Sequence, residues 1–149
     1  MKQKYREYLK LNKNILIAFA VSIAISAIAA DYFANQEDYL NSTFTLIVDY
    51  AVFFSVFGGL FYYDNRKKYV LENGETNKSL LKSDLIKIIS SLGIGEVVYT
   101  IARWSLQYYL LLLNYEPYMA SIISQLISTV IYMITLNITI KLTKLFKDN

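Results

Sequence analysis

The segment from Tyr118 to Ile140, YMASIISQLISTVIYMITLNITI, decides the fold of this chain, because its 23 residues include no charged side chain. A helix rises about 1.5 Å per residue, so a segment of this length crosses a bilayer core about 30 Å thick. The alternative is a soluble four-helix bundle, in which every helix needs a polar face toward water. This segment has no charge to place on such a face, and we predict a transmembrane helix over 118–140.

Three similar apolar blocks precede this segment, and they predict helices over about 14–34, 43–63 and 86–113. Of the whole chain, 55% of the residues are hydrophobic and 18% are charged, whereas a soluble domain carries about 25% charge. The first block also has the basic start and the Ala27-Ile28-Ala29 triplet of a signal peptide, but we expect it to be retained. We predict an all-α polytopic integral membrane protein, with residues 1–149 forming one antiparallel bundle of four transmembrane helices.

The basic residues indicate how the chain is oriented. Of the 15, 13 lie in the N-terminal tail, in a middle loop over 64–84, or after position 140, and Lys87 lies just after that loop. The connections 35–42 and 114–117 contain acidic residues and no base. Loops rich in Lys and Arg stay in the cytoplasm, so both termini are predicted to be cytoplasmic, in the cell (plasma) membrane. Residues 1–13 are compatible with a helix on the membrane surface or with a solvated tail.

Local signals mark the ends of the predicted helices. Asn73-Gly74 predicts a turn in the middle loop. Ser83 or Asp84 is expected to cap the third helix. Pro117 suits the first turn of the fourth helix, where the missing N–H costs nothing.

Three charged residues, Asp49, Glu96 and Arg103, fall at membrane depth. Each costs at least about 2.5–3.5 kcal/mol to insert, so each requires a partner or a function. Glu96, Arg103 and Gln107 share one helix face with Thr100, and that face should point toward protein or water.

The first predicted partner of Arg103 is Asp49 on the second helix, because an Arg stem spans the axial offset between them. Asp31 is the second candidate. Glu96 then remains unpaired, with Lys87 or a neighbouring subunit as its possible partner. Three interpretations stay open: an ion pair that sets helix register, which we favour, a contact with a partner subunit, or a proton or ion path through Glu96 and Asp49.

Small residues recur at four-residue spacing in all four blocks, which favours close helix packing. These rows are Ser22, Ser26 and Ala30; Ser55 and Gly59; Ser91 and Gly95; and Ala120, Ser124 and Ser128. The fourth block also carries more polar residues than one interface needs, Asn137 among them. We predict a packing interface at Ala120, Ser124, Ser128 and Asn137, with this helix either central in the bundle or facing another protein.

Several classes of function are excluded or disfavoured. The chain has no Cys and no His, which excludes disulfides, thiolate zinc sites, Cys or His nucleophiles, and His-held haem or copper. No carboxylates are paired at acid–base spacing, so we expect no catalysis by this chain alone and no cofactor or metal. The net charge of +3 is too small to indicate nucleic acid as a partner.

A first resemblance covers Leu92–Phe146. This stretch has an early glycine in one helix, a short Leu-rich turn, and Leu136-Asn137 late in the next helix. It resembles half of a GtrA-type four-helix protein, a family linked to the transfer of lipid-linked sugars across membranes. That family continues with a basic residue and an aromatic, where this chain has Ile138-Thr139-Ile140. The resemblance implies a small transporter or flippase using Glu96, Arg103 and Asp49.

A second resemblance rests on three stretches: Asp64–Tyr69 (DNRKKY), Arg103-Trp104, and Asn114–Ser121 (NYEPYMAS). They resemble uncharacterised four-helix membrane proteins of ammonia-oxidising archaea, some of which accompany the copper-dependent ammonia monooxygenase as extra subunits. The resemblance implies a non-catalytic accessory subunit whose partners are other integral membrane subunits. We adopt this function as the leading expectation, with the transporter as its alternative. A third option is a tether that binds anionic membrane lipids through the basic tail and middle loop.

Overall fold

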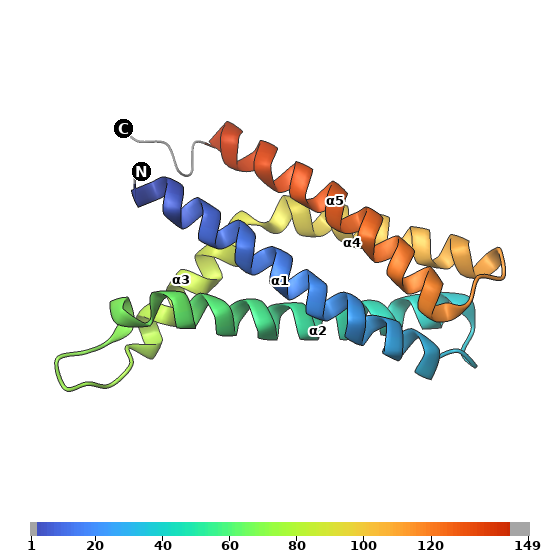
Figure 1. The fold of residues 1–149 in the computed structure, drawn as a ribbon, viewed down its shortest axis with the longest axis horizontal. Helices are drawn as coiled ribbons and strands as arrows, with labels where there is room; N and C mark the ends of the chain where they lie inside the picture. The colour runs from blue at the N-terminus through green and yellow to red at the C-terminus, as the bar shows by residue number, and fades with distance from the viewer. Residues whose placement is uncertain (1–2, 144–149) are drawn as a thin grey trace.

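The structure is a computed structural model that describes residues 3–143, except for the side chains at positions 91, 140 and 143. The described part is all-α, as predicted (Figure 1). Its elements are α1 (Gln3–Tyr32), α2 (Asp38–Asn65), the short 3-10 helix η1 (Arg66–Tyr69), α3 (Lys78–Ser91), α4 (Gly93–Leu112) and α5 (Pro117–Thr143).

Four of the helices form a closed ring. Helix α1 packs against α2 and α5, and α4 packs against the same two helices from the other side. Neighbours in this ring run antiparallel, so α1 begins and α5 ends at the same end of the bundle, at the left of Figure 1. The connections α1–α2 and α4–α5 lie at the opposite end, and α3 lies outside the ring (Figure 1).

The helices have the length and composition of membrane spans. Helices α1, α2 and α5 are each long and apolar enough to cross a membrane. The bent pair of α3 and α4 meets the same criteria when the two helices are taken together, which makes up to four spans. The 20 residues of α4 rise about 30 Å, which matches a bilayer core. Ile94, Val97 and Ile101 on its outer face are 65%, 60% and 63% exposed, as suits contact with lipid tails. The chain is a multi-pass membrane protein.

The prediction of one continuous third helix over 86–113 is wrong. The chain bends by 58° between α3 and α4, and Leu92, the residue between them, has a ψ of −4°. Two glycines follow the bend, Gly93 and Gly95, and glycine is the weakest helix former after proline. Gly95 also allows close packing, because a Cβ there would lie 3.0 Å from the ring of Tyr132 on α5, which would then have to shift.

The middle connection is shorter than predicted. Helix α3 already begins at Lys78, within the expected loop 64–84, because the Asn77 side chain accepts a hydrogen bond from the Leu80 backbone N–H and caps the helix. Neither Ser83 nor Asp84 is the cap. The predicted turn is present, with Gly74 at a φ of +83°, a conformation that glycine adopts without strain.

Helix α1 begins at Gln3 rather than near position 14, so the basic segment continues the first span as one helix. Its 30 residues rise about 45 Å, which is longer than a bilayer core, so one end of α1 extends beyond the hydrocarbon region. Helix α5 begins at Pro117, as predicted.

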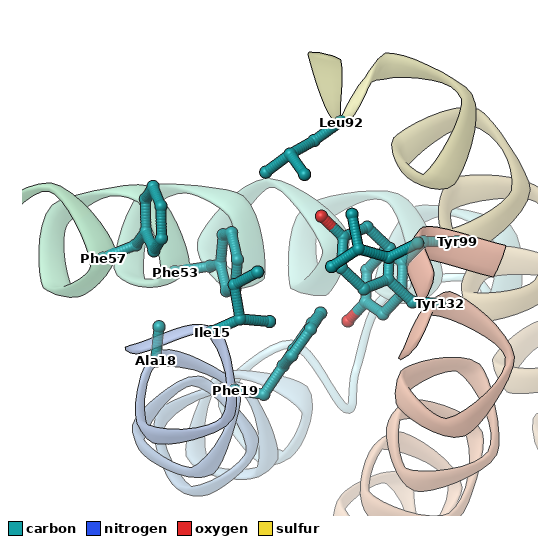
Figure 2. Packing of buried hydrophobic residues seen from close by; sticks show 9 residues of the cluster. Ile15, Ala18, Phe19, Phe53, Phe57, Leu92, Tyr99 and Tyr132 are labelled. Atoms are coloured by element: carbon teal, nitrogen blue, oxygen red, sulfur yellow. The ribbon is translucent and has the colours of Figure 1, made fainter. Parts of the chain in front are cut away.

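Aromatic rings fill the centre of the ring of helices (Figure 2). The Phe19 ring of α1 lies 4.6 Å from Phe53 of α2 and 5.3 Å from both Tyr99 of α4 and Tyr132 of α5, between ring centroids. Phe57 extends the cluster along α2. Because these residues fall midway along their helices, the cluster separates the bundle into two halves with different chemistry.

Candidate functional site

The half of the bundle beyond the aromatic cluster, toward the α1–α2 connection, contains a buried ion pair. Arg103 of α4 places Nε 3.5 Å from Oδ2 of Asp49 on α2, and their side chains are 0% and 1% exposed. The structure thus joins the two residues that the sequence pairs first. Asp31, the second candidate, accepts instead a hydrogen bond of 3.0 Å from the backbone N–H of Tyr118 at the start of α5.

The Asp49 carboxylate is hydrogen-bonded from three other helices. The hydroxyls of Ser22 on α1 and Tyr99 on α4 donate to its two oxygens. The Gln125 amide on α5 donates to Oδ1 at 2.9 Å. A carboxylate buried without such donors would be strongly destabilised, whereas hydrogen bonds to the ionised form offset its desolvation.

The Arg103 guanidinium makes a second set of bonds, chiefly with α5. It donates to the Gln107 side chain, to Ser124 Oγ at 2.7 Å, and to Ser121 Oγ at 3.0 Å. Among the described residues the Nε atom has no hydrogen-bond partner, so its contact with Asp49 is electrostatic rather than a directed bond. Arg103 therefore links α4 to α2 through charge and to α5 through hydroxyl acceptors.

The network continues to the end of the bundle. Gln107 Nε2 donates to Asn41 Oδ1 at 2.9 Å, and Asn41 Nδ2 donates to the Ala30 carbonyl at the end of α1, also at 2.9 Å. All four helices of the ring are thereby joined by side-chain bonds. We call this set, Ser22, Asn41, Asp49, Tyr99, Arg103, Gln107, Ser121, Ser124 and Gln125, the polar network.

The polar residues of the fourth predicted helix point inward. Ala120, Ser124 and Ser128 are fully buried. Asn137 is half-buried, donates to the Met133 carbonyl and accepts a bond from the Tyr8 hydroxyl of α1. The structure turns Ala120, Ser124 and Ser128 toward the interior of the bundle, on the side of α5 that packs against α1 and α4.

Three members of the polar network were not predicted from the sequence: Asn41, Tyr99 and Ser121. A signal was present, because Asn41 and Tyr99 fall at four-residue multiples from Asp49 and Arg103, on the same helix faces. Nothing in the sequence distinguishes Tyr99, as a member of a buried network, from the many tyrosines near the ends of the spans. Ser121 needed the tertiary structure, since its role depends on the register between α4 and α5.

Glu96 lies in the first turn of α4, beside the hydroxyls of Tyr50 and Tyr132. Within the described part of the chain, its Oε1 atom and the Tyr132 hydroxyl are buried and have no hydrogen-bond partner. Tyr50 is bonded elsewhere, to Thr100 Oγ1 and to the Glu96 carbonyl. Among the described residues Glu96 thus forms no ion pair with a basic side chain, as the sequence predicts, and it lies apart from the Arg103 contacts.

The small-residue rows divide between two roles. Ser22 and Ser26 are fully buried, and Gly95 faces Tyr132, so these rows pack inside the bundle as expected. Ser55 and Gly59 do not, because both are exposed on the outer face of α2. The expectation of internal packing is wrong for that row.

Among the residues that the structure describes, no cluster of three or more Asp, Glu, His or Cys side chains is placed to hold a metal ion. Comparisons with protein-family models, with curated proteins and with solved structures find no match to this chain. The interpretation of the site therefore rests on its own geometry.

Proposed function

We propose that this protein is a non-catalytic structural subunit that packs against other integral membrane proteins. The observation that carries the proposal is that Asp49 and Arg103 bind each other and side chains of this same chain. Charges paired in this way set the register of four helices, and both the Asp49 carboxylate and the Arg103 guanidinium already have partners within the chain. In this proposal the outer surface of the bundle, rather than its buried polar network, is the part that binds another protein.

The outer face of α2 supports a contact with another helix. Ala51, Ser55 and Gly59 lie one turn apart on that face, and all three are exposed. A Cβ at Gly58 or Gly59 would meet nothing within 4 Å, so packing within the chain does not require glycine at either position. Each glycine costs about 1 kcal/mol relative to Ala inside a helix. Close approach of a partner helix would offset this cost.

The proposal is tested by isolating the protein from its native membrane in a mild detergent and measuring its mass. We expect a complex with other membrane chains, and a stable monomer of 17.2 kDa would contradict the proposal. Because the chain has no cysteine, Ser55→Cys carrying a thiol-attached photocrosslinker should capture a partner. Ile101→Cys on the outer face of α4 is the matched control and should capture none.

We also propose that the end of the bundle with the start of α1 and the end of α5 faces the cytoplasm. The basic residues gathered at that end support this orientation through the positive-inside rule. Asn73→Cys should resist an impermeant maleimide added to intact cells, whereas Gln36→Cys should react. The opposite pattern would invert the orientation.

A specific version of the proposal names the complex. The resemblance to small archaeal membrane proteins supports a place beside a copper-dependent ammonia monooxygenase as an accessory subunit. Copurification with the subunits of that enzyme is the expected result. Copurification with unrelated membrane chains alone would contradict this version and leave the structural role intact.

One observation favours a second candidate, a small transporter or flippase for lipid-linked sugars. Just after the break between α3 and α4, the buried Oε1 of Glu96 has no hydrogen-bond partner in the described part of the chain. Broken helices at membrane depth form the substrate sites of many transporters. In this version Glu96→Gln abolishes flux into liposomes, while Glu116→Gln in the α4–α5 connection does not. Flux that survives Glu96→Gln and Arg103→Ala would rule it out.

A further inference from the structure

The first turn of α4 contains an acid whose carboxyl group lies among hydroxyls of two other helices. Glu96 follows the break at Leu92 and forms no ion pair with a basic side chain of the described residues. Its Oε1 atom is buried and lacks a hydrogen-bond partner there. The hydroxyls of Tyr50 on α2 and Tyr132 on α5 both lie within reach of the carboxyl group. The site is therefore built by three helices rather than by the acid alone.

Tyr132 supplies a hydrogen-bond donor at this site. Its ring belongs to the aromatic cluster (Figure 2), the residue is 0% exposed, and its hydroxyl has no hydrogen-bond partner in the described part of the chain. A phenol hydroxyl carries a hydrogen to donate, and leaving it unbonded in the interior costs free energy. An ionised Glu96 carboxylate is a strong acceptor for it. Tyr132 is thus matched to the ionised state of Glu96.

Tyr50 supplies an acceptor. Its hydroxyl donates to the backbone carbonyl of Glu96 at 3.3 Å, so its hydrogen points to the backbone rather than to the carboxyl group. Thr100 donates to the same carbonyl at 2.8 Å. The Tyr50 oxygen can still accept a hydrogen bond, and a protonated carboxyl group has an O–H to donate. Tyr50 is thus matched to the protonated state of Glu96.

The surrounding charges do not hold Glu96 in one state. Across the bundle, α2 contributes Asp49, whose charge is compensated by Arg103. The charged residue of α5 within its described length is Lys141, in the last turn of that helix. Lys87 of α3 lines a separate cavity at the basic end of the bundle. A carboxyl group beside a cation stays ionised, whereas none of these groups fixes the state of Glu96.

We propose that Glu96 binds and releases a proton, with Tyr132 donating to the ionised carboxylate and Tyr50 accepting from the protonated carboxyl group. Each state then has a hydrogen-bond partner, so the exchange leaves no buried polar atom unsatisfied. The inference depends on neither proposed function, because proton binding requires no partner chain and no transported solute.

Labelling with dicyclohexylcarbodiimide tests the proposal, because this apolar reagent forms a stable N-acylurea with a protonated carboxyl group and not with a carboxylate. The full chain is labelled in neutral detergent at a series of pH values, and mass spectrometry locates the adduct. We expect the adduct on Glu96, with labelling that falls about tenfold for each pH unit above its midpoint. Glu96→Gln should abolish the labelling, whereas Glu116→Gln in the α4–α5 connection should not. Labelling at another carboxyl group instead, or labelling of Glu96 that does not change with pH, would overturn the proposal.

The infrared C=O band of a protonated carboxyl group gives a measurement that does not depend on access of the reagent. The band should disappear as the pH rises and should be missing from Glu96→Gln at every pH. A chain that shows neither the adduct nor a band that depends on Glu96 would overturn the proposal.

Two conservative variants test the roles of the tyrosines. Tyr132→Phe keeps the ring and removes the donor to the ionised state, so the midpoint should move to higher pH by about one unit. Tyr50→Phe removes the acceptor for the protonated state and should move the midpoint to lower pH. Tyr109→Phe, exposed on α4, is the matched control and should leave the midpoint unchanged. Midpoints that move in the same direction in the first two variants, or in neither, would overturn the proposed site.

Discussion

At the residue scale, Arg103 is the residue on which the bundle depends most. It is fully buried, carries a full charge, and contacts partners on both flanking helices. Such a residue is not interchangeable with Lys, because a planar guanidinium donates in several directions at once, whereas an ammonium is a single point charge. Because Arg103 and Asp49 are both buried, removing either side chain leaves the charge of the other uncompensated and destabilises the protein.

We predict that Arg103→Met destabilises the protein by about 3–5 kcal/mol, because it leaves the Asp49 carboxylate buried without a compensating charge. The double variant Asp49→Asn with Arg103→Met should recover much of that loss, since it removes the charge as well. Unfolding by SDS titration in mixed micelles measures both effects. A double variant no more stable than Arg103→Met alone would show that hydrogen bonds, rather than charge balance, dominate the network.

At the element scale, the two glycine positions on α2 and α4 have opposite environments. Gly95 lies against the Tyr132 ring, whereas Gly59 faces open space. Both are glycines inside long apolar helices, and their neighbours in the chain do not distinguish them. The packing of α4 against α5 makes one of them necessary to this bundle, while the other is free to change within the isolated chain.

Gly95→Ala is predicted to destabilise the isolated protein by about 1–3 kcal/mol, because the added Cβ overpacks the contact with Tyr132. Gly59→Ala is the matched control and should stabilise it by up to about 1 kcal/mol, because alanine is the better helix former. The same SDS titration compares the two variants. If Gly95→Ala proved neutral, α4 and α5 would not approach as closely as the structure shows.

At the scale of the whole molecule, the structure has a closed ring of four helices and one helix, α3, outside it. The ring is held by the polar network, the aromatic cluster and the bond from Tyr118 to Asp31. Helix α3 is attached mainly through η1, α4 and the bond from Lys68 to Asp84. The two parts should therefore differ in local stability.

Hydrogen exchange measured by mass spectrometry should show faster exchange in α3 and in residues 66–77 than in the half of α4 that contains Arg103. Few buried contacts hold α3, and segments of that kind open locally at low free energy. Uniform protection across α3 and α4 would contradict this division of the molecule.

The membrane-spanning character was predictable from the sequence because it depends on runs of apolar residues alone. The pair of Asp49 and Arg103 was predictable for a related reason, since two opposite charges at membrane depth must find each other or another partner. The break at Leu92 was not predictable, because 86–113 is continuously apolar enough to hide it. Nor was the start of α3, because Asn77 competes as a cap with the equally suitable Ser83 and Asp84.

The class of the protein follows from its sequence alone, and so do the number and approximate place of its apolar blocks and the need for partners at three buried charges. These follow from the cost of placing polar groups in hydrocarbon, which acts on each segment separately. Two features needed the folded structure: the inward-facing polar side of α5 and the outward-facing small residues of α2. These features depend on the rotation and register of each helix relative to its neighbours, which many contacts set together.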